Sequence, residues 1–183
     1  MFFLSIFLPL TSFLVCIILK DFFKSKQLCF ISCALLSLAS ICSIISLFTL
    51  RTDGETTLIL GSWINSGSLD LNWAIQHNLL TGSMILMVNF VSTLIHIYSV
   101  GYMEKDPKNV LFMGYISLFT FFMLFLVSSS NLVQLFLGWE GVGLTSYLLI
   151  GFWNYKDSAN NAALKAFIAN RVGDFGLLLA LFL

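Results

Sequence analysis

Long apolar runs separated by short polar links make up most of this chain. A helix needs about 20 predominantly apolar residues to cross a bilayer. Runs of about that length lie near residues 2–19, 28–50, 80–102, 110–128, 131–151 and 161–183. The pattern therefore predicts an all-α integral membrane protein with about six transmembrane helices.

The link between the second and third runs, residues 51–78, is the one long stretch outside these apolar runs. Residues 58–64 and 69–75 within it are rich in Leu, Ile and Trp, and the Asn-Ser-Gly-Ser sequence between them is a turn signal. We therefore expect one short β-hairpin on the membrane surface. Residues 1–79 would then form a helix pair with this hairpin, and residues 80–183 a further helix bundle.

Charge is scarce, and its distribution limits the possible partners. Only 10% of the residues are charged and 58% are apolar, whereas ordinary globular domains carry about 25% charged residues. Nine basic residues balance nine acidic ones, so we expect no nucleic-acid partner; the expected surroundings are a lipid bilayer and other membrane proteins. Most lysines lie in the first, third and fifth links, which by the positive-inside rule face the cytoplasm or the mitochondrial matrix.

The sequence offers no set of residues that would bind a redox cofactor or metal. Cys16, Cys29, Cys33 and Cys42 lie in or beside apolar runs, and no histidine or second cysteine pair nearby completes a metal site. We interpret them as small packing residues. The chain also lacks a glycine-rich phosphate loop, a haem signature and a nucleophile motif.

Glu140 lies near the middle of the fifth run, where charge is expensive. A carboxylate at that depth costs about 3 kcal/mol or more unless it is paired or protonated. A carboxyl balanced between burial and a nearby cation can take up and release a proton. Glycines on both sides let helices approach closely, so we expect Glu140 to face the bundle interior as a proton-relay residue. The alternative is a protonated Glu140 that only bonds a neighbouring helix.

Three further charged residues lie in the sixth run. Arg171 and Asp174 are three apart, share a helix face and can pair. They lie roughly 15–20 Å from the helix start, and buried structural pairing is the alternative to a role in a proton path. Lys165 lies about one turn inside the membrane edge. Its side chain can either extend to the membrane surface or face a channel, and the sequence favours neither interpretation.

His96 lies in the third run, on a helix face with Asn89, Ser92 and Thr93. Histidine side chains titrate near neutral pH, so His96 can extend a proton path. A lone histidine is as often a packing residue with satisfied hydrogen bonds. The polar face indicates a hydrated or interhelical surface.

Three stretches carry specific motifs. Residues 94–103 read LIHIYSVGYM, residues 137–144 read LGWEGVGL, and residues 163–174 contain ALKAF and NRVGD. They resemble the third, fifth and sixth helices of chain 5 of NADH-quinone oxidoreductase, the antiporter-like membrane subunit of respiratory complex I. The resemblance runs from about residue 80 to the end, whereas residues 1–79 hold no sharp motif.

This resemblance implies a proton-translocating subunit that couples NADH-to-quinone electron transfer to proton pumping. The glutamate that matches Glu140 is a proton-channel carboxylate, and the residues that match Lys165, Arg171 and Asp174 lie near the channel. NADH, FMN, iron–sulfur clusters and quinone are implied on other subunits, and no cofactor on this chain. The family has an aspartate where this chain has Asn78.

The resemblance also implies that residues 80–183 begin the antiporter-like proton-channel bundle. The family's partner lysine on the seventh helix and its second half-channel lie beyond Leu183, so we expect a fragment or one piece of a split gene product. The many phenylalanines and the compact links favour the mitochondrial inner membrane, with a bacterial inner membrane as the alternative.

Two other functions remain open. A subunit of a multisubunit cation/proton antiporter shares the Gly-Trp-Glu helix but drives no redox reaction. A membrane fragment that only fills space in a complex is the third interpretation, because the downstream lysine is missing.

Overall fold

The computed structural model describes residues 1–66 and 69–182, most of which are helical. The elements in chain order are α1 (Phe2–Ile18), α2 (Ser25–Asp53), β1 (Thr56–Ser66), β2 (Leu69–His77), α3 (Leu79–Tyr102), α4 (Asn109–Val127), α5 (Leu132–Ile150) and α6 (Asp157–Phe182). By length and composition, α2, α3, α4 and α5 can each cross a membrane. The predicted all-α membrane fold with one hairpin is confirmed.

The first and last helices in the chain, α1 and α6, differ from these four. The apolar helix α1 has 17 residues, which is about 26 Å at 1.5 Å per residue. Its length is therefore slightly below the hydrocarbon thickness of a typical bilayer, about 30 Å. The helix α6 has 26 residues but carries the charged residues of the sixth run.

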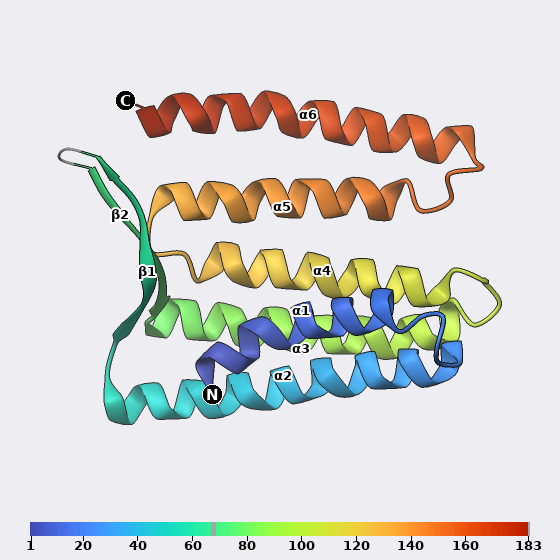
Figure 1. The fold of residues 1–183 in the computed structure, drawn as a ribbon, viewed down its shortest axis with the longest axis horizontal. Helices are drawn as coiled ribbons and strands as arrows, with labels where there is room; N and C mark the ends of the chain where they lie inside the picture. The colour runs from blue at the N-terminus through green and yellow to red at the C-terminus, as the bar shows by residue number, and fades with distance from the viewer. Residues whose placement is uncertain (67–68, 183) are drawn as a thin grey trace.

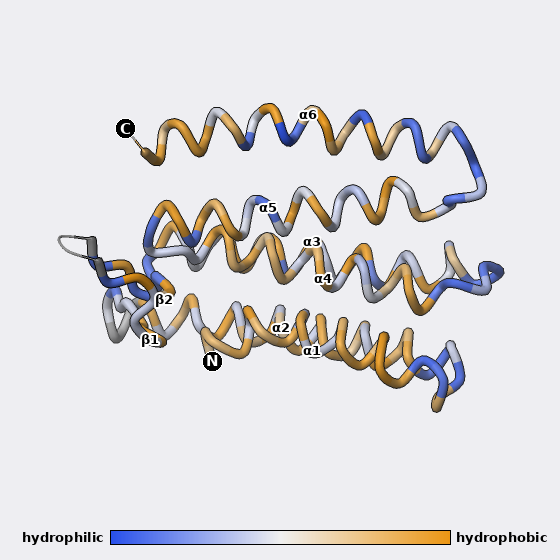
Figure 2. Tube along the Cα trace, turned by 45° about the horizontal axis from the view of Figure 1, so that its top comes forward, coloured by the Kyte–Doolittle hydropathy of each residue, from blue (hydrophilic) through white to orange (hydrophobic). Residues whose placement is uncertain are grey.

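Successive helices run antiparallel to one another (Figure 1). Helices α1 to α4 form a cluster, α5 packs on α4 at one side of it, and α6 packs on α5. The links after α1, α3 and α5 lie at one end, which we call the lysine-rich end, and the hairpin and the α4–α5 link lie at the other. Figure 2 shows mostly hydrophobic helices, with hydrophilic residues gathered in the links. Helix α6 is the outermost helix and packs on α5, so among residues 1–66 and 69–182 nothing covers its far face.

Polar side chains hold α1 to α4 together from inside. Ser12 of α1, Ser32 of α2 and Ser117 of α4 form a buried triangle, with Oγ–Oγ distances of 2.8, 3.0 and 3.4 Å. Ser40 and Thr93 join α2 to α3 at 2.8 Å. Lipid tails are as apolar as leucine, so close packing of small residues and interhelical hydrogen bonds must bind the helices.

The hairpin is confirmed, with β1 two residues longer at each end than the predicted 58–64 and β2 two residues longer at its end than the predicted 69–75. Strands β1 and β2 pair antiparallel from Thr56↔His77 to Ser66↔Leu69, with irregularities at Ile59/Gly61 and Ser62/Ile64. Gly67 and Ser68, in the predicted turn, lie outside the described residues.

Strand β2 is fixed to the α4–α5 link. The Gln76 amide donates to the Ser128 carbonyl at 2.9 Å. The Asn131 side-chain amide donates to the Asn72 carbonyl, also at 2.9 Å, and Gln134 Oε1 accepts from the Ala74 amide at 3.3 Å. The hairpin therefore lies across the end of the bundle, and β2, which leads into α3, is hydrogen-bonded to the start of α5.

Candidate functional site

Two glycines of α5 let it lie directly against α4. A Cβ atom added at Gly138 would lie 2.8 Å from the Cα of Leu126, so the two backbones are in contact there. A Cβ atom added at Gly141 would overlap the ring of Phe122. The glycine face of α5 is therefore the face that packs on α4.

Glu140 lies on a different face of α5 from these glycines. It follows Gly138 by two residues, which rotates its side chain about 200° around the helix. Its carboxylate therefore faces α6, where Arg171 Nη1 donates to Glu140 Oε1 at 2.8 Å. The side chain is 30% exposed, so the expectation of an interior position was only partly right.

Asp174 is the buried member of the same group. Its side chain is 7% exposed, and the indole Nε1 of Trp139 donates to its Oδ1 at 2.9 Å. Arg171 Nη1 lies 3.9 Å from Asp174 Oδ2. The predicted Arg171–Asp174 pair exists, but Glu140 is the closer partner, so one guanidinium serves two carboxylates.

The charge balance of this group suits it to bind one proton. With both carboxyls ionised, Glu140, Asp174 and Arg171 carry one net negative charge; with one proton bound they are neutral. A net charge within a bilayer is costly, so the neutral state is favoured there. The arrangement can therefore hold a proton on one carboxyl and release it when another cation approaches.

A cavity of about 390 Å³ opens beside these residues. The Arg171 guanidinium lies 5.2 Å from the centre of the Phe167 ring, which forms part of the wall. One water occupies about 30 Å³, so the cavity has room for water molecules beside Glu140. Its lining residues are Phe122, Leu137, Glu140, Gly141, Gly143, Leu144, Phe167, Asn170, Arg171 and Asp174.

The other two candidate residues lie apart from this group. Lys165 is exposed on α6, six residues before Arg171, which is about 9 Å along the helix. His96 is fully buried among α1 to α4, where Nδ1 lies 2.8 Å from the Ser92 carbonyl and Nε2 lies 2.9 Å from Ser117 Oγ. A carbonyl only accepts, so Nδ1 carries a hydrogen, while the Ser117 hydroxyl donates to the Met113 carbonyl at 3.0 Å.

Two functional contacts were not foreseen from the sequence. The Trp139 indole donates a hydrogen bond to Asp174. The Phe122 ring packs against Gly141, next to Glu140 in the sequence. Trp139 stands next to Glu140 in the sequence, but only the placement of α6 reveals its partner. Asn78, which departs from the family's aspartate, caps α3: its Oδ1 accepts from the Thr81 amide at 2.8 Å, as an aspartate would.

The ion pair predicts a specific result for paired substitutions. Arg171→Gln leaves Glu140 and Asp174 without their cation, so we expect less assembled complex in membranes. Adding Glu140→Gln to Arg171→Gln leaves Asp174 as the one uncompensated carboxylate of the group and should restore part of the assembly, because each unpaired buried charge is costly. Native gel electrophoresis of solubilised membranes measures this, with Lys165→Gln as the control on the same helix. Equal loss in the single and double variants would contradict the pairing.

Two family models match the chain. Residues 63–113 match the N-terminus of chain 5 of NADH-ubiquinone oxidoreductase (complex I), and residues 129–183 match the transmembrane model of NADH:quinone oxidoreductase and the Mrp antiporter. NADH-ubiquinone oxidoreductase chain 5 of Chondrus crispus is 51% identical over 146 residues, which is 79% of this chain and 22% of that protein. The chain 5 of Triticum aestivum is 43% identical, covering 100% of this chain and 27% of that protein.

Bacterial and structural relatives agree. NADH-quinone oxidoreductase subunit L of Rickettsia bellii is 46% identical over 95% of this chain and 27% of that protein. The chain thus spans about a quarter of the length of the curated relatives it matches. A chain of the membrane-bound sulfane sulfur reductase, an archaeal respiratory membrane complex, shares the fold: the TM-score is 0.83 at 18% identity, over 97% of this chain and 35% of that one. This chain belongs to the chain 5 family of NADH-quinone oxidoreductase and matches the N-terminal part of its members.

Proposed function

We propose that this chain forms part of a proton-translocating membrane subunit of respiratory complex I, in which Glu140 takes up and releases the translocated proton. The observation that carries the proposal is the Glu140–Arg171–Asp174 group, two carboxylates that share one guanidinium where α5, a helix able to cross a membrane, meets α6. With one proton bound the group is neutral, and with none it carries one negative charge, so a nearby cation decides which state it adopts. Relays of this kind are the usual role of carboxylates inside membranes.

Three of the four other candidate residues have a place in this proposal, and His96 does not. Arg171 is the counter-ion that stabilises the ionised form of Glu140, and Asp174, held by Trp139, keeps Arg171 near it. Lys165 is a second cation on α6, nearer the lysine-rich end. His96 belongs to a separate polar group, because its neighbour on α4 is Ser117, whereas Glu140 faces α6.

The proposed setting is a multi-subunit enzyme. NADH, FMN, iron–sulfur clusters and quinone would be bound by other subunits, and this chain would supply no redox centre. Its partners are other membrane subunits of the complex and the surrounding lipid. The membrane is the mitochondrial inner membrane, or the inner membrane of a bacterium.

One measurement separates this function from its two rivals. In vesicles that contain the assembled complex, we expect NADH to drive proton uptake and a quinone-site inhibitor to abolish it. A cation/proton antiporter subunit, which the second family description also admits, would exchange cations for protons without NADH and resist the inhibitor. If the chain only filled space, neutralising Glu140 would leave proton uptake unchanged.

A further inference from the structure

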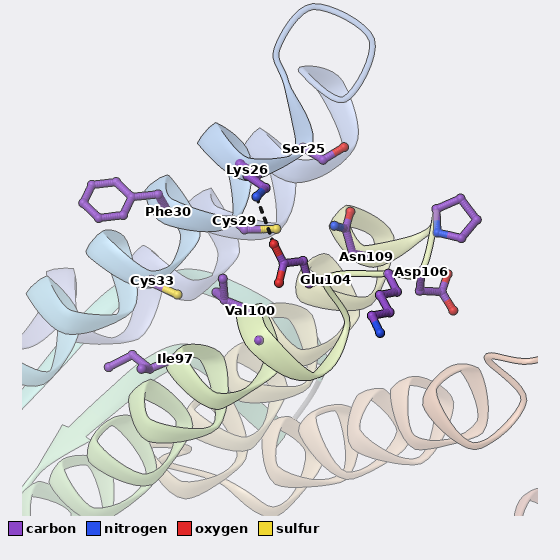
Figure 3. A pocket seen from close by; sticks show the side chains of 13 residues that line it. Ser25, Lys26, Cys29, Phe30, Cys33, Ile97, Val100, Glu104, Asp106 and Asn109 are labelled. Carbon is purple, nitrogen blue, oxygen red and sulfur yellow. Dashed lines mark hydrogen bonds and ion pairs between the residues drawn. The ribbon is translucent and has the colours of Figure 1, made fainter.

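A second cavity lies far from Glu140, at the lysine-rich end of the bundle. Its volume is about 710 Å³, and it lies between the start of α2 and the end of α3, closed on one side by the α3–α4 link (Figure 3). Helix α2 begins at Ser25 and α3 ends at Tyr102. The mouth of the cavity therefore lies at the boundary of the membrane-spanning segments, at the level of lipid headgroups.

The cavity has an apolar wall and a charged mouth. Phe30, Ile97 and Val100 form the wall and are 75%, 56% and 41% exposed. At the mouth, Lys26 Nζ donates to Glu104 Oε1 at 2.9 Å (Figure 3). An apolar slot leading from a charged pair into the membrane matches the shape of a phospholipid, with an acyl chain below its headgroup.

The charged pair has unused hydrogen-bonding capacity. An ammonium group has three donors, and a carboxylate accepts about four hydrogen bonds; the pair uses one of each. The Lys26 hydrogen bond also lowers the pKa of Glu104 below its usual value, so Glu104 stays ionised at neutral pH. Lys26 can thus bind a phosphate while Glu104 accepts from a second cation.

The formal charges of the lining residues sum to zero, so they do not favour an anionic headgroup. Lys26 and Lys105 are balanced by Glu104 and Asp106. Asp106 is already held by the Lys108 amide and the Trp153 indole, at 2.9 and 3.0 Å. A headgroup with one negative and one positive charge matches this lining, and an N–H-bearing ammonium matches it better than a methylated one, because Glu104 needs a donor.

We propose that the cavity between α2 and α3 is a binding site for a phospholipid with an ethanolamine headgroup. The phosphate binds Lys26, the ammonium donates to Glu104, and one acyl chain lies along Phe30, Ile97 and Val100. From Lys26 to Cys33, which also lines the cavity, the slot follows α2 for about 10 Å. This length accommodates the upper part of an acyl chain.

The test compares lipids retained by the whole purified complex. The complex is stripped of loosely bound lipid and exposed to vesicles of phosphatidylethanolamine, phosphatidylcholine or phosphatidylglycerol, and bound lipid is counted by mass spectrometry. We expect the complex carrying Lys26→Gln and Glu104→Gln to retain one phosphatidylethanolamine fewer than the unaltered complex. Lys20→Gln, in the neighbouring link but outside the cavity, should retain the full number. Both altered residues are largely exposed, at 85% and 60%, so the fold should survive.

Several outcomes would overturn the proposal. Equal phosphatidylethanolamine retention by the double variant and the Lys20→Gln control would show that the pair does not bind the headgroup. Equal retention of phosphatidylcholine by the unaltered complex would remove the role of Glu104 as acceptor, and preferred retention of phosphatidylglycerol would indicate an anionic site. A protein segment filling the cavity in the assembled complex would also rule the lipid out.

Discussion

Glu140→Gln is expected to stop proton translocation while leaving the complex assembled. Glutamine keeps the shape of a protonated glutamate and can still accept a hydrogen bond from Arg171, but it cannot release a proton. Positioned acid–base groups contribute roughly 10²–10⁴-fold to proton-transfer rates, so we expect proton uptake to fall at least about tenfold. Electron transfer from NADH should fall with it if the two processes are tightly coupled.

The measurement is NADH-driven proton uptake into vesicles, normalised to the amount of assembled complex. Glu140→Asp is the matched variant, since it keeps the carboxyl but moves it one methylene away from Arg171. It should retain part of the activity. Normal uptake in the Gln variant would end the relay role of this residue and leave a packing role in its place.

Gly138→Ala is expected to destabilise the assembly although it adds a single methyl group. The added Cβ would lie 2.8 Å from Leu126 Cα and 2.9 Å from Leu126 N, which are backbone atoms that cannot rotate away. Overpacking of this kind costs about 1–3 kcal/mol. Separation of α5 from α4 would also move Glu140 relative to its cavity, so both assembly and proton uptake should fall.

Gly173→Ala provides the control on the neighbouring helix. A Cβ added at Gly173 meets nothing within 4 Å, and alanine favours a helix more than glycine does. Thermal stability of the solubilised complex should therefore drop for Gly138→Ala and stay level or rise for Gly173→Ala. The same stability for both variants would mean that α4 and α5 are not in backbone contact at Gly138.

The sequence predicted best those features that depend only on the residues of one segment. Apolar runs of membrane length located the helices, and the turn signal near Asn65 located the hairpin, because neither depends on distant neighbours. Glu140, Arg171 and Asp174 could be identified as candidates since charges in apolar runs are rare for energetic reasons. Their grouping is a property of how α5 meets α6.

Contacts between distant elements could not be derived from the pattern. The glycines around Glu140 suggested that all of them share its environment, yet Gly138 and Gly141 face α4 while Glu140 faces α6. His77 had no assigned role, but its ring stacks on Phe2 at 4.0 Å and its Nε2 lies 2.9 Å from Ser46 Oγ. Side-chain pairs of this kind follow from the packing of whole helices.

The attachment of β2 to the α4–α5 link imposes an order on the biogenesis of this chain. The amides of Ala74 and Gln76 find their acceptors at Gln134 and Ser128, which leave the ribosome more than fifty residues later. Until then these amides need other partners, such as water, although His77 at the end of β2 can already contact Phe2 and Ser46. The hydrogen bond to Ser128 can therefore form only once α3 and α4 have been synthesised, and the one to Gln134 only once α5 has begun.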